Sequence, residues 1–227
     1  MSAPDFDAQE QEPVEETSTY KLIREDILSG RLAASERLKV GALATRYNTS
    51  TNPVREALQQ LRGEGFVVFE HNRGARVRAI DEDFIRNVYE IEVLVEPYMT
   101  KWFVGIVTAA DIAHLEDIQD QIETLAFRDR DLNNELDMQF HRVFYDRHYN
   151  RNAFDMWWKH REILRAVSRS YPLSLTRSAA ILSEHRALIA ALKTQDAEAA
   201  ANVIAAHVRG SGQHVIEQMR AARPKAS

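Results

Sequence analysis

The chain has 227 residues, no cysteine and a formal net charge of -5. This length has room for two modest domains with separate cores, and the lack of cysteine excludes disulfides and thiolate metal sites. The sequence contains neither an apolar run that could span a membrane nor a basic and then apolar leader. We therefore expect a soluble cytoplasmic protein with no membrane partner.

Charge is distributed unevenly along the chain. Residues 1–16 carry six acidic and no basic side chains, residues 17–80 carry 11 basic against 6 acidic ones, and residues 81–227 carry 18 against 22. The acidic start has few apolar residues, which predicts a disordered tail over 1–16. The basic segment is typical of nucleic-acid binding, although a solvated surface can have the same charge.

Two short helices are predicted at the start of the basic segment. Thr17 or Ser18 can cap a first helix that Gly30 ends. A second helix is expected over 40–47, followed by a turn at 48–50.

A third helix and a hairpin follow. The helix begins at Ser50 or Asn52, and Pro53 is compatible with its first turn, where a backbone N–H has no partner. After Gly65, the segments FVVFE and ARVRAI predict two short strands that join at 72–74. Three helices and a β-wing in this order predict a winged helix-turn-helix, whose third helix enters the major groove of DNA.

The rest of the chain, from Asp81, shows only helical periods, so the expected fold is mainly α. We predict a DNA-binding domain over 17–80 and an antiparallel six-helix bundle over 81–227 that binds an effector and dimerises. The predicted helices cover 82–104, 109–126, 129–148, 151–170, 175–194 and 196–220.

One aspartate and three histidines are candidate metal ligands. Asp137 and His141 are four residues apart, which places them on one face of a helix. His185 and His207 lie at equal distances from the turn at 195–196, hence at one level of two antiparallel helices. Imidazole and carboxylate groups suit zinc, nickel, manganese or iron. On spacing alone, ordinary polar surface is the favoured interpretation of these four residues.

Residues 17–80 resemble the GntR family of bacterial transcription regulators, in the FadR-type group with an all-helical effector domain. Six helices after the wing are similar to the VanR-like variant of that domain. The motifs that carry the resemblance are Gly30-Arg31-Leu32, Glu36-Arg37-Leu38, Leu43-Ala44, Ser50 to Leu58 (STNPVREAL), Leu61 to Gly65 (LRGEG) and Gly74 to Val77 (GARV).

The resemblance implies a set of DNA contacts. Arg55 is the expected main base or phosphate contact of the third helix, and Arg73 lies at the wing tip. The remaining implied contacts are the lesser readers Thr51, Asn52 and Gln59 and the phosphate contacts Arg46 and Arg62.

Two departures from the family pattern concern the DNA contacts. Thr51 and Gly41 stand where the family commonly has arginines. Such arginines typically make bidentate contacts to guanine. We therefore expect an unusual operator.

The resemblance also implies a metal centre, because metal-binding members have an Asp-x-x-x-His helix followed by two histidines on the last two helices. Asp137, His141, His185 and His207 match that pattern, and zinc is the first candidate ion.

Glu92 stands where many members have a basic residue that binds an effector carboxylate. The effector would then carry an amine, or its cation would be elsewhere, at Arg161 or Arg165; a solvated stripe is the alternative.

Together these features predict a non-enzymatic, ligand-responsive repressor of a catabolic operon. It would bind a palindromic double-stranded operator as a homodimer and respond to a small-molecule metabolite. Two alternatives remain open. One is a metal-dependent hydrolase with an accessory DNA-binding domain, and the other is a nucleoid-type DNA binder without a ligand.

Overall fold

The computed structural model describes residues 18–70 and 73–222, and the chain divides into two compact units, Met1–Val77 and Arg78–Ser227. Each unit encloses its own set of buried apolar side chains. The acidic segment 1–16, for which the sequence predicts disorder, lies outside the described residues.

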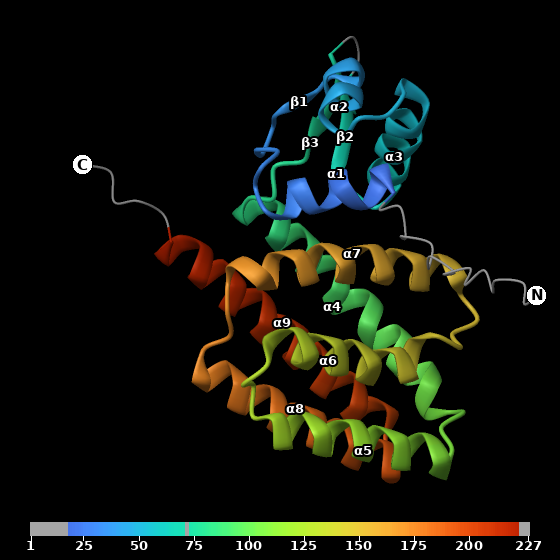
Figure 1. The fold of residues 1–227 in the computed structure, drawn as a ribbon. Helices are drawn as coiled ribbons and strands as arrows, with labels where there is room; N and C mark the ends of the chain where they lie inside the picture. Colours follow the sequence, from blue (N-terminus) through green and yellow to red (C-terminus); the bar gives the residue numbers. More distant parts are fainter. Residues whose placement is uncertain (1–17, 71–72, 223–227) are drawn as a thin grey trace, which may run out of the picture. The chain divides into compact units, whose positions relative to one another are not determined.

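Three helices form most of the N-terminal unit, namely α1(Thr19–Leu28), α2(Val40–Arg46) and α3(Thr51–Gly63) (Figure 1). The Ser18 side chain caps α1 by accepting from the Lys21 N–H, and Gly30 adopts a φ of 77° just after the helix. Ser50 occupies the N-cap position of α3 without a side-chain hydrogen bond. The helices pack around the fully buried side chains of Ile23, Val54, Leu58, Leu61 and Phe66.

A three-stranded antiparallel sheet completes this unit. The two predicted strands are β2(Val67–Glu70) and β3(Gly74–Val77), which pair with Val67 opposite Val77 and Glu70 opposite Gly74. The sequence analysis missed β1(Arg37–Leu38), which pairs with the other edge of β3. Two residues are too few to show a strand's alternation, so only the tertiary pairing defines β1. The turn residues 71 and 72 lie outside the described part.

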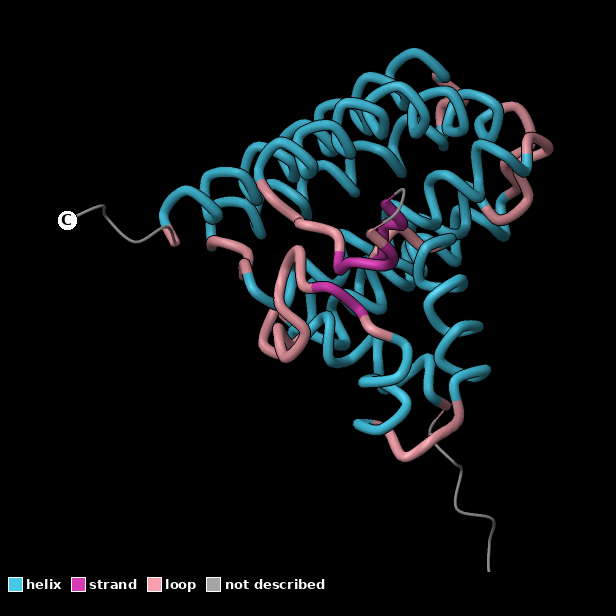
Figure 2. Tube along the Cα trace, turned by 90° about the horizontal axis from the view of Figure 1, so that it is seen from above, coloured by secondary structure: helices cyan, strands magenta, loops and turns pink. Residues whose placement is uncertain are grey.

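The described part of the C-terminal unit is entirely helical, as predicted, and all three strands belong to the N-terminal unit (Figure 2). Its six helices are α4(Glu82–Val104), α5(Ala109–Leu125), α6(Arg130–Tyr145), α7(Arg151–Ser170), α8(Leu175–Lys193) and α9(Ala197–Ala221). No helix of the described chain is both long and apolar enough to cross a bilayer.

Side-chain caps begin the helices that carry the candidate metal ligands. Asp129, Ser174 and Asp196 each accept a hydrogen bond from the backbone of the first turn of α6, α8 and α9. Between α8 and α9 the chain reverses at Gln195, whose φ is 52°. This tight reversal makes α8 and α9 antiparallel neighbours, so His185 and His207 face the same region.

The longest helices, α4 and α9, pack closely along each other (Figure 1). At Gly212 of α9 the packing leaves no room for a side chain, since an added Cβ would lie 2.6 Å from Cγ of Tyr89 on α4. Together with α4, the helices α5, α6 and α7 contribute to a core that contains Phe103, Phe140, Phe144 and Trp157, all 0% exposed. The candidate metal ligands border this core.

Candidate functional site

A basic hollow lies between α3 and the sheet of the N-terminal unit. Its volume is about 380 Å³, and three of its lining residues are cations, Arg37 and Lys39 around β1 and Arg55 on α3. No carboxylate lines the hollow, and none among the described residues forms an ion pair with these three side chains. Unpaired, exposed cations around one concave surface are typical of a polyanion-binding site.

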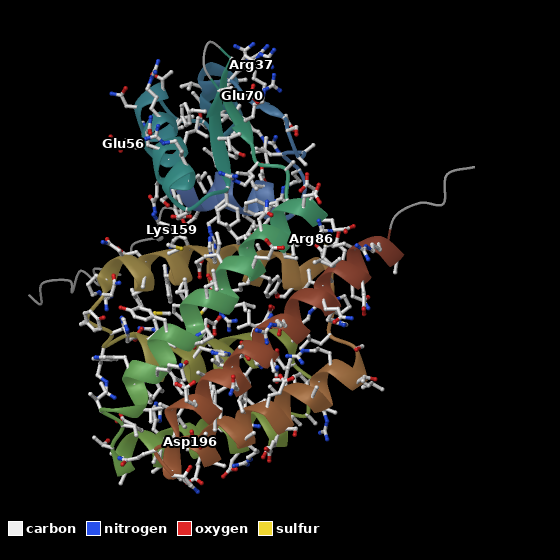
Figure 3. All side chains as sticks on the ribbon, turned by 180° about the vertical axis from the view of Figure 1, so that it is seen from behind. Arg37, Glu56, Glu70, Arg86, Lys159 and Asp196 are labelled. Atoms are coloured by element: carbon white, nitrogen blue, oxygen red, sulfur yellow. The ribbon has the colours of Figure 1, made fainter. Side chains whose placement is uncertain are left out.

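The other basic residues of this unit make internal contacts. Arg46 forms an ion pair with Asp26, at 2.6 Å, and Arg73 lies 3.8 Å from Glu70. The guanidinium of Arg62 lies over the ring of Phe69. Figure 3 shows Arg37 and Glu70 at the sheet and Glu56 on α3.

All seven residues expected to contact DNA are exposed, but they have different surroundings. Gln59 lines the basic hollow together with Arg55. Thr51 and Asn52 form the first turn of α3. Arg37 and Lys39, which the sequence analysis did not select, belong to the hollow because β1 brings them beside α3.

The four candidate metal ligands converge inside the C-terminal unit. Asp137 and His141 come from α6, His185 from α8 and His207 from α9. One ligand atom of each lies within 4.8 Å of one ligand atom of every other. The three histidines are almost fully buried, whereas the Asp137 side chain is 26% exposed. Carboxylate and imidazole donors at this spacing have the chemistry and number of a divalent-metal site.

Hydrogen bonds from outside the cluster orient two of the imidazoles. Nδ1 of His185 donates to Oε1 of Gln119, at 2.9 Å, and Nδ1 of His207 donates to Oε2 of Glu184, at 2.8 Å. Since each Nδ1 carries the proton, the lone pair of Nε2 is free to bind an ion. Arg177 makes two 2.8 Å bonds to Glu184 and thereby fixes the carboxylate behind His207.

The third imidazole has a carboxylate behind it at a longer distance. Nδ1 of His141 lies 3.7 Å from Oε2 of Glu96, which itself accepts a hydrogen bond from the Tyr145 hydroxyl. Both nitrogens of His141 and Nε2 of His185 are buried and have no hydrogen-bond partner. Buried polar atoms are almost always paired. The unpaired nitrogens therefore favour an ion bound between the four side chains.

The electrostatic surroundings of Asp137, His141 and His185 shift the pKa values of these three side chains downward. Burial, together with Arg161 and the other histidines, holds the pKa of His141 well below its usual range. Burial and His207 lower the pKa of His185 to about 3. Burial acts to raise the pKa of Asp137, but the charge and hydrogen bond of Arg161 together with the neighbouring His185 and His207 outweigh it, so that this pKa lies below its usual value. Neutral imidazoles and an ionised carboxylate are the forms that bind metals.

A cavity of about 110 Å³ opens beside the cluster and is lined in part by Asp137 and His207. The two arginines expected to contact an effector, Arg161 and Arg165, both line it. Arg161 donates to Oδ2 of Asp137 at 2.6 Å. Glu92 is not among the lining residues; it is 0% exposed and bonds to Nδ1 of His160 at 2.5 Å.

Sequence reasoning grouped the four candidate ligands but not the residues behind them. Gln119, Glu96 and Arg177 act from α5, α4 and the first turn of α8, and none stands at an informative spacing from a histidine. Glu184 had a weak signal, since it precedes His185 directly. Its contact is nevertheless with His207 on the next helix, which only the packing of α8 on α9 reveals.

The two units match two family models. Residues 16–77 match the model described as bacterial regulatory proteins, gntR family, and residues 87–210 match the FCD domain. The repressor RspR of Escherichia coli K12 is 26% identical over 214 residues, which cover 92% of this chain and 90% of RspR. The gluconate operon transcriptional repressor of Bacillus subtilis 168 is 27% identical over 184 residues, which cover 77% and 74% of the two chains.

Solved structures share the fold. Escherichia coli McbR/YncC superposes with a TM-score of 0.67 at 17% identity, covering 89% of this chain and 97% of that one. A GntR regulator from Rhodococcus sp. RHA1 gives a TM-score of 0.63 at 20% identity, covering 92% and 99%. The relatives are transcription regulators rather than enzymes. With a family match to each unit, this chain belongs to the GntR family of bacterial transcription regulators and carries an FCD domain.

Proposed function

We propose that this GntR-family protein is a repressor whose DNA binding depends on a divalent metal and a small-molecule effector in the FCD domain. The convergence of Asp137, His141, His185 and His207 carries the proposal, because an ion-binding cluster beside a cavity is joined in one chain to a DNA-binding unit. Zinc is the first candidate, and nickel, manganese and iron share its ligand chemistry.

The metal would supply a positive charge that orients an anionic or polar effector group in the cavity. The chain's own residues contribute the rest of this binding. Gln119 and Glu184 orient the imidazoles of His185 and His207, and Arg161 donates to Oδ2 of Asp137. An effector that binds one conformation more tightly would shift the population of the DNA-binding state. This is the basis of regulation in the proposal.

DNA contact would come from α3 and the basic hollow. Arg55 and Gln59 would lie in the major groove, while Arg37 and Lys39 would contact the backbone. We propose a homodimer on a palindromic operator, since two half-sites about 34 Å apart are read by two symmetrically placed helices. The names of the repressor relatives support the repressor assignment.

The experiment begins with metal content. Purified wild-type protein without chelator, reconstituted with Zn²⁺, is expected to retain one ion per chain, and His185→Ala is expected to lose it. His114→Ala, which removes an exposed histidine of α5, is the matched control and retains the ion. Absence of stoichiometric metal from the wild type contradicts the metal part of the proposal.

The second step selects operator sequences from a randomised duplex library with the full-length protein. Enrichment of a palindrome by the wild type and its loss in Arg55→Ala support sequence-specific repression. Arg128→Ala, an exposed arginine of the C-terminal unit, is the control. Equal affinity for all duplexes instead favours a nucleoid-type binder. Metal-dependent hydrolysis by the wild type, abolished in His185→Ala, favours the hydrolase alternative.

A further inference from the structure

The four candidate metal ligands are accessible from one side. The three histidines are almost fully buried among the helices, whereas Asp137 is 26% exposed and, with His207, lines the cavity of about 110 Å³. An ion therefore reaches the cluster through this cavity. A segment that closes the cavity would then control how fast ions exchange.

Most of the cavity wall comes from helices α4 to α9, but three lining residues belong to connections between helices. Phe127 follows α5, and Tyr171 and Leu173 belong to residues 171–174, the α7–α8 loop. Both connections lie at the left end of the C-terminal unit in Figure 1. Helices that pack in a core move together with that core, whereas a connection can open locally.

The connection at Phe127 is a closed turn. The N–H of Ala126 donates to the Ile122 carbonyl, and the N–H of Arg128 donates to that of Leu125, each at 3.1 Å. Ala126 and Phe127 have φ values of 49° and 57°. Residues with a side chain adopt this left-handed conformation only where their surroundings determine it strongly. This side of the cavity is therefore held in place by its own backbone.

The α7–α8 loop has a much weaker attachment. Its first N–H, of Tyr171, donates to Val167 of α7, and Ser174 caps α8. Within the described chain, the hydrogen bonds that join this loop to any other helix all involve His214 of α9. Nε2 of His214 lies 3.3 Å from the Ser174 nitrogen and 3.2 Å from the Pro172 carbonyl oxygen.

The two contacts of Nε2 exclude each other, because one imidazole nitrogen either donates or accepts. With the proton on Nδ1 alone, His214 accepts from Ser174; in the other tautomer and in the cation, it donates to Pro172. One of the two bonds is therefore present in every protonation state. A single hydrogen bond shifts an equilibrium by about fivefold, which favours a closed loop and still permits frequent opening.

We propose that the α7–α8 loop is a lid over the cavity, that His214 latches it to α9, and that its opening sets the rate at which a divalent ion enters and leaves the cluster. The inference rests on the proposed function, because the ion is the one that the cluster would bind. His214 acts on access and not on the bound ion. A lid changes the rates of entry and release by the same factor, so Kd stays unchanged.

The test measures Zn²⁺ exchange with the full-length protein. Kd is obtained first, by competition with a chromophoric chelator. Stopped-flow mixing then gives uptake by the metal-free protein and release into excess chelator. His214→Leu keeps an apolar side chain and removes the hydrogen bond, and it is expected to accelerate uptake and release alike by about fivefold at unchanged Kd. His214→Gln, whose amide can both donate and accept, is expected to exchange zinc as the wild type does.

Two leucines of the same segment provide a second, independent pair of variants. Leu173 lines the cavity, whereas Leu175, the first residue of α8, is 91% exposed and does not line it. Leu173→Ala is expected to accelerate both uptake and release, because it removes an apolar contact that closes the lid. Leu175→Ala is the matched control and should leave both rates unchanged. This pair leaves α9 intact, which covers the case that His214→Leu disturbs folding.

The outcomes separate the lid from the metal site itself. If the wild type binds no zinc at equilibrium, the proposed function fails. If zinc binds but exchanges at wild-type rates in both His214→Leu and Leu173→Ala, only the lid is overturned. Faster release with unaltered uptake also overturns it, because His214 would then act on the bound ion. Equal acceleration by Leu175→Ala would show a general loosening of the segment and overturns it as well.

Discussion

A single buried carboxylate connects three parts of the DNA-binding unit. Asp26, 6% exposed, accepts from Arg31 at 2.5 Å and from the Tyr47 hydroxyl at 2.7 Å, and it pairs with Arg46. These partners come from the loop after α1 and from the end of α2. Asp26 on α1 therefore connects α1 with α2 through hydrogen bonds and an ion pair.

Replacing Asp26 with asparagine tests this connection. We expect Asp26→Asn to destabilise the N-terminal unit by about 2 kcal/mol, because hydrogen bonds to a charged group are lost while the arginines remain partly exposed. Urea unfolding at neutral pH measures the change. Glu56→Gln, an exposed carboxyl of α3, is the control, and equal stability of the two variants contradicts the connecting role of Asp26.

The same carboxylate predicts a dependence on pH. Burial acts to raise the pKa of Asp26, but the bonds from Tyr47 and Arg31 and the charge of Arg46 lower it below its usual 3.8. A lowered folded-state pKa contributes stability that is complete above the unfolded value and is lost as pH falls through the folded value. Wild-type stability of this unit should therefore decrease below about pH 4 more steeply than that of Asp26→Asn.

Arg37 and Lys39 are two further cations of the basic hollow that could contact the DNA backbone. Position 41 is a glycine, and the side chains of Arg37 and Lys39 line the hollow beside Arg55. We expect Arg37→Ala and Lys39→Ala each to weaken binding of every duplex alike and to reduce the slope of log K against log salt by about 0.9, the value for one phosphate contact. A loss confined to one operator sequence would indicate base contact instead.

At the scale of helices, the approach of α4 to α9 depends on a glycine. A Cβ at Gly212 would lie 2.6 Å from Cγ and 2.9 Å from Cβ of Tyr89, both close to the stiff part of that side chain. We expect Gly212→Ala to destabilise the C-terminal unit by about 1–3 kcal/mol, as overpacking usually does. Thermal unfolding measures this, with Gly63→Ala, whose surroundings are open, as the control.

A second change separates crowding from helix propensity. If the clash with Tyr89 causes the loss of stability, Gly212→Ala should destabilise the protein much less in a Tyr89→Ala background. The double-mutant cycle would then show strong coupling between the two positions. Additive effects of the two substitutions would mean that α4 and α9 do not meet at this point.

Helices that carry their own signals were predictable, and contacts between helices were not. The helix starts predicted at 109, 151 and 196 lie within one residue of the observed ones, where the side chains of Thr108, Asn150 and Asp196 provide the caps. By contrast, β1 has no local pattern, and it is the reason that Arg37 and Lys39 lie beside Arg55. Local propensity determines where an element begins, whereas tertiary packing determines which side chains it brings together.

The candidate site also combines features that the sequence predicts with features that only tertiary packing determines. The spacing of Asp137, His141, His185 and His207 reflects helix geometry, so the sequence sufficed to group them. The interpretation of Glu92 as an effector contact relied on position alone, and the structure places that side chain against His160 instead of in the cavity. Which side of α4 faces the cavity depends on how the other helices pack against α4. The sequence alone does not specify that packing.

At the scale of the whole molecule, two units with separate cores should respond separately to perturbation. The four candidate metal ligands, and the groups behind them, all belong to the C-terminal unit. Asp26 and its partners belong to the N-terminal unit. Ligand binding stabilises only the cooperative unit that contains the site.

Calorimetry of the full-length chain should therefore resolve two transitions. At a free Zn²⁺ concentration about 100-fold above its Kd, the C-terminal unit gains about 2.7 kcal/mol, which corresponds to a shift of roughly 5–10 °C for a domain of this size. The N-terminal transition should stay in place. His185→Ala should abolish the zinc shift without moving the N-terminal transition, and Asp26→Asn should lower the N-terminal transition without changing the zinc shift. A single transition that moves as a whole with zinc would instead show that the two units unfold together, and metal binding would then stabilise the DNA-binding unit directly.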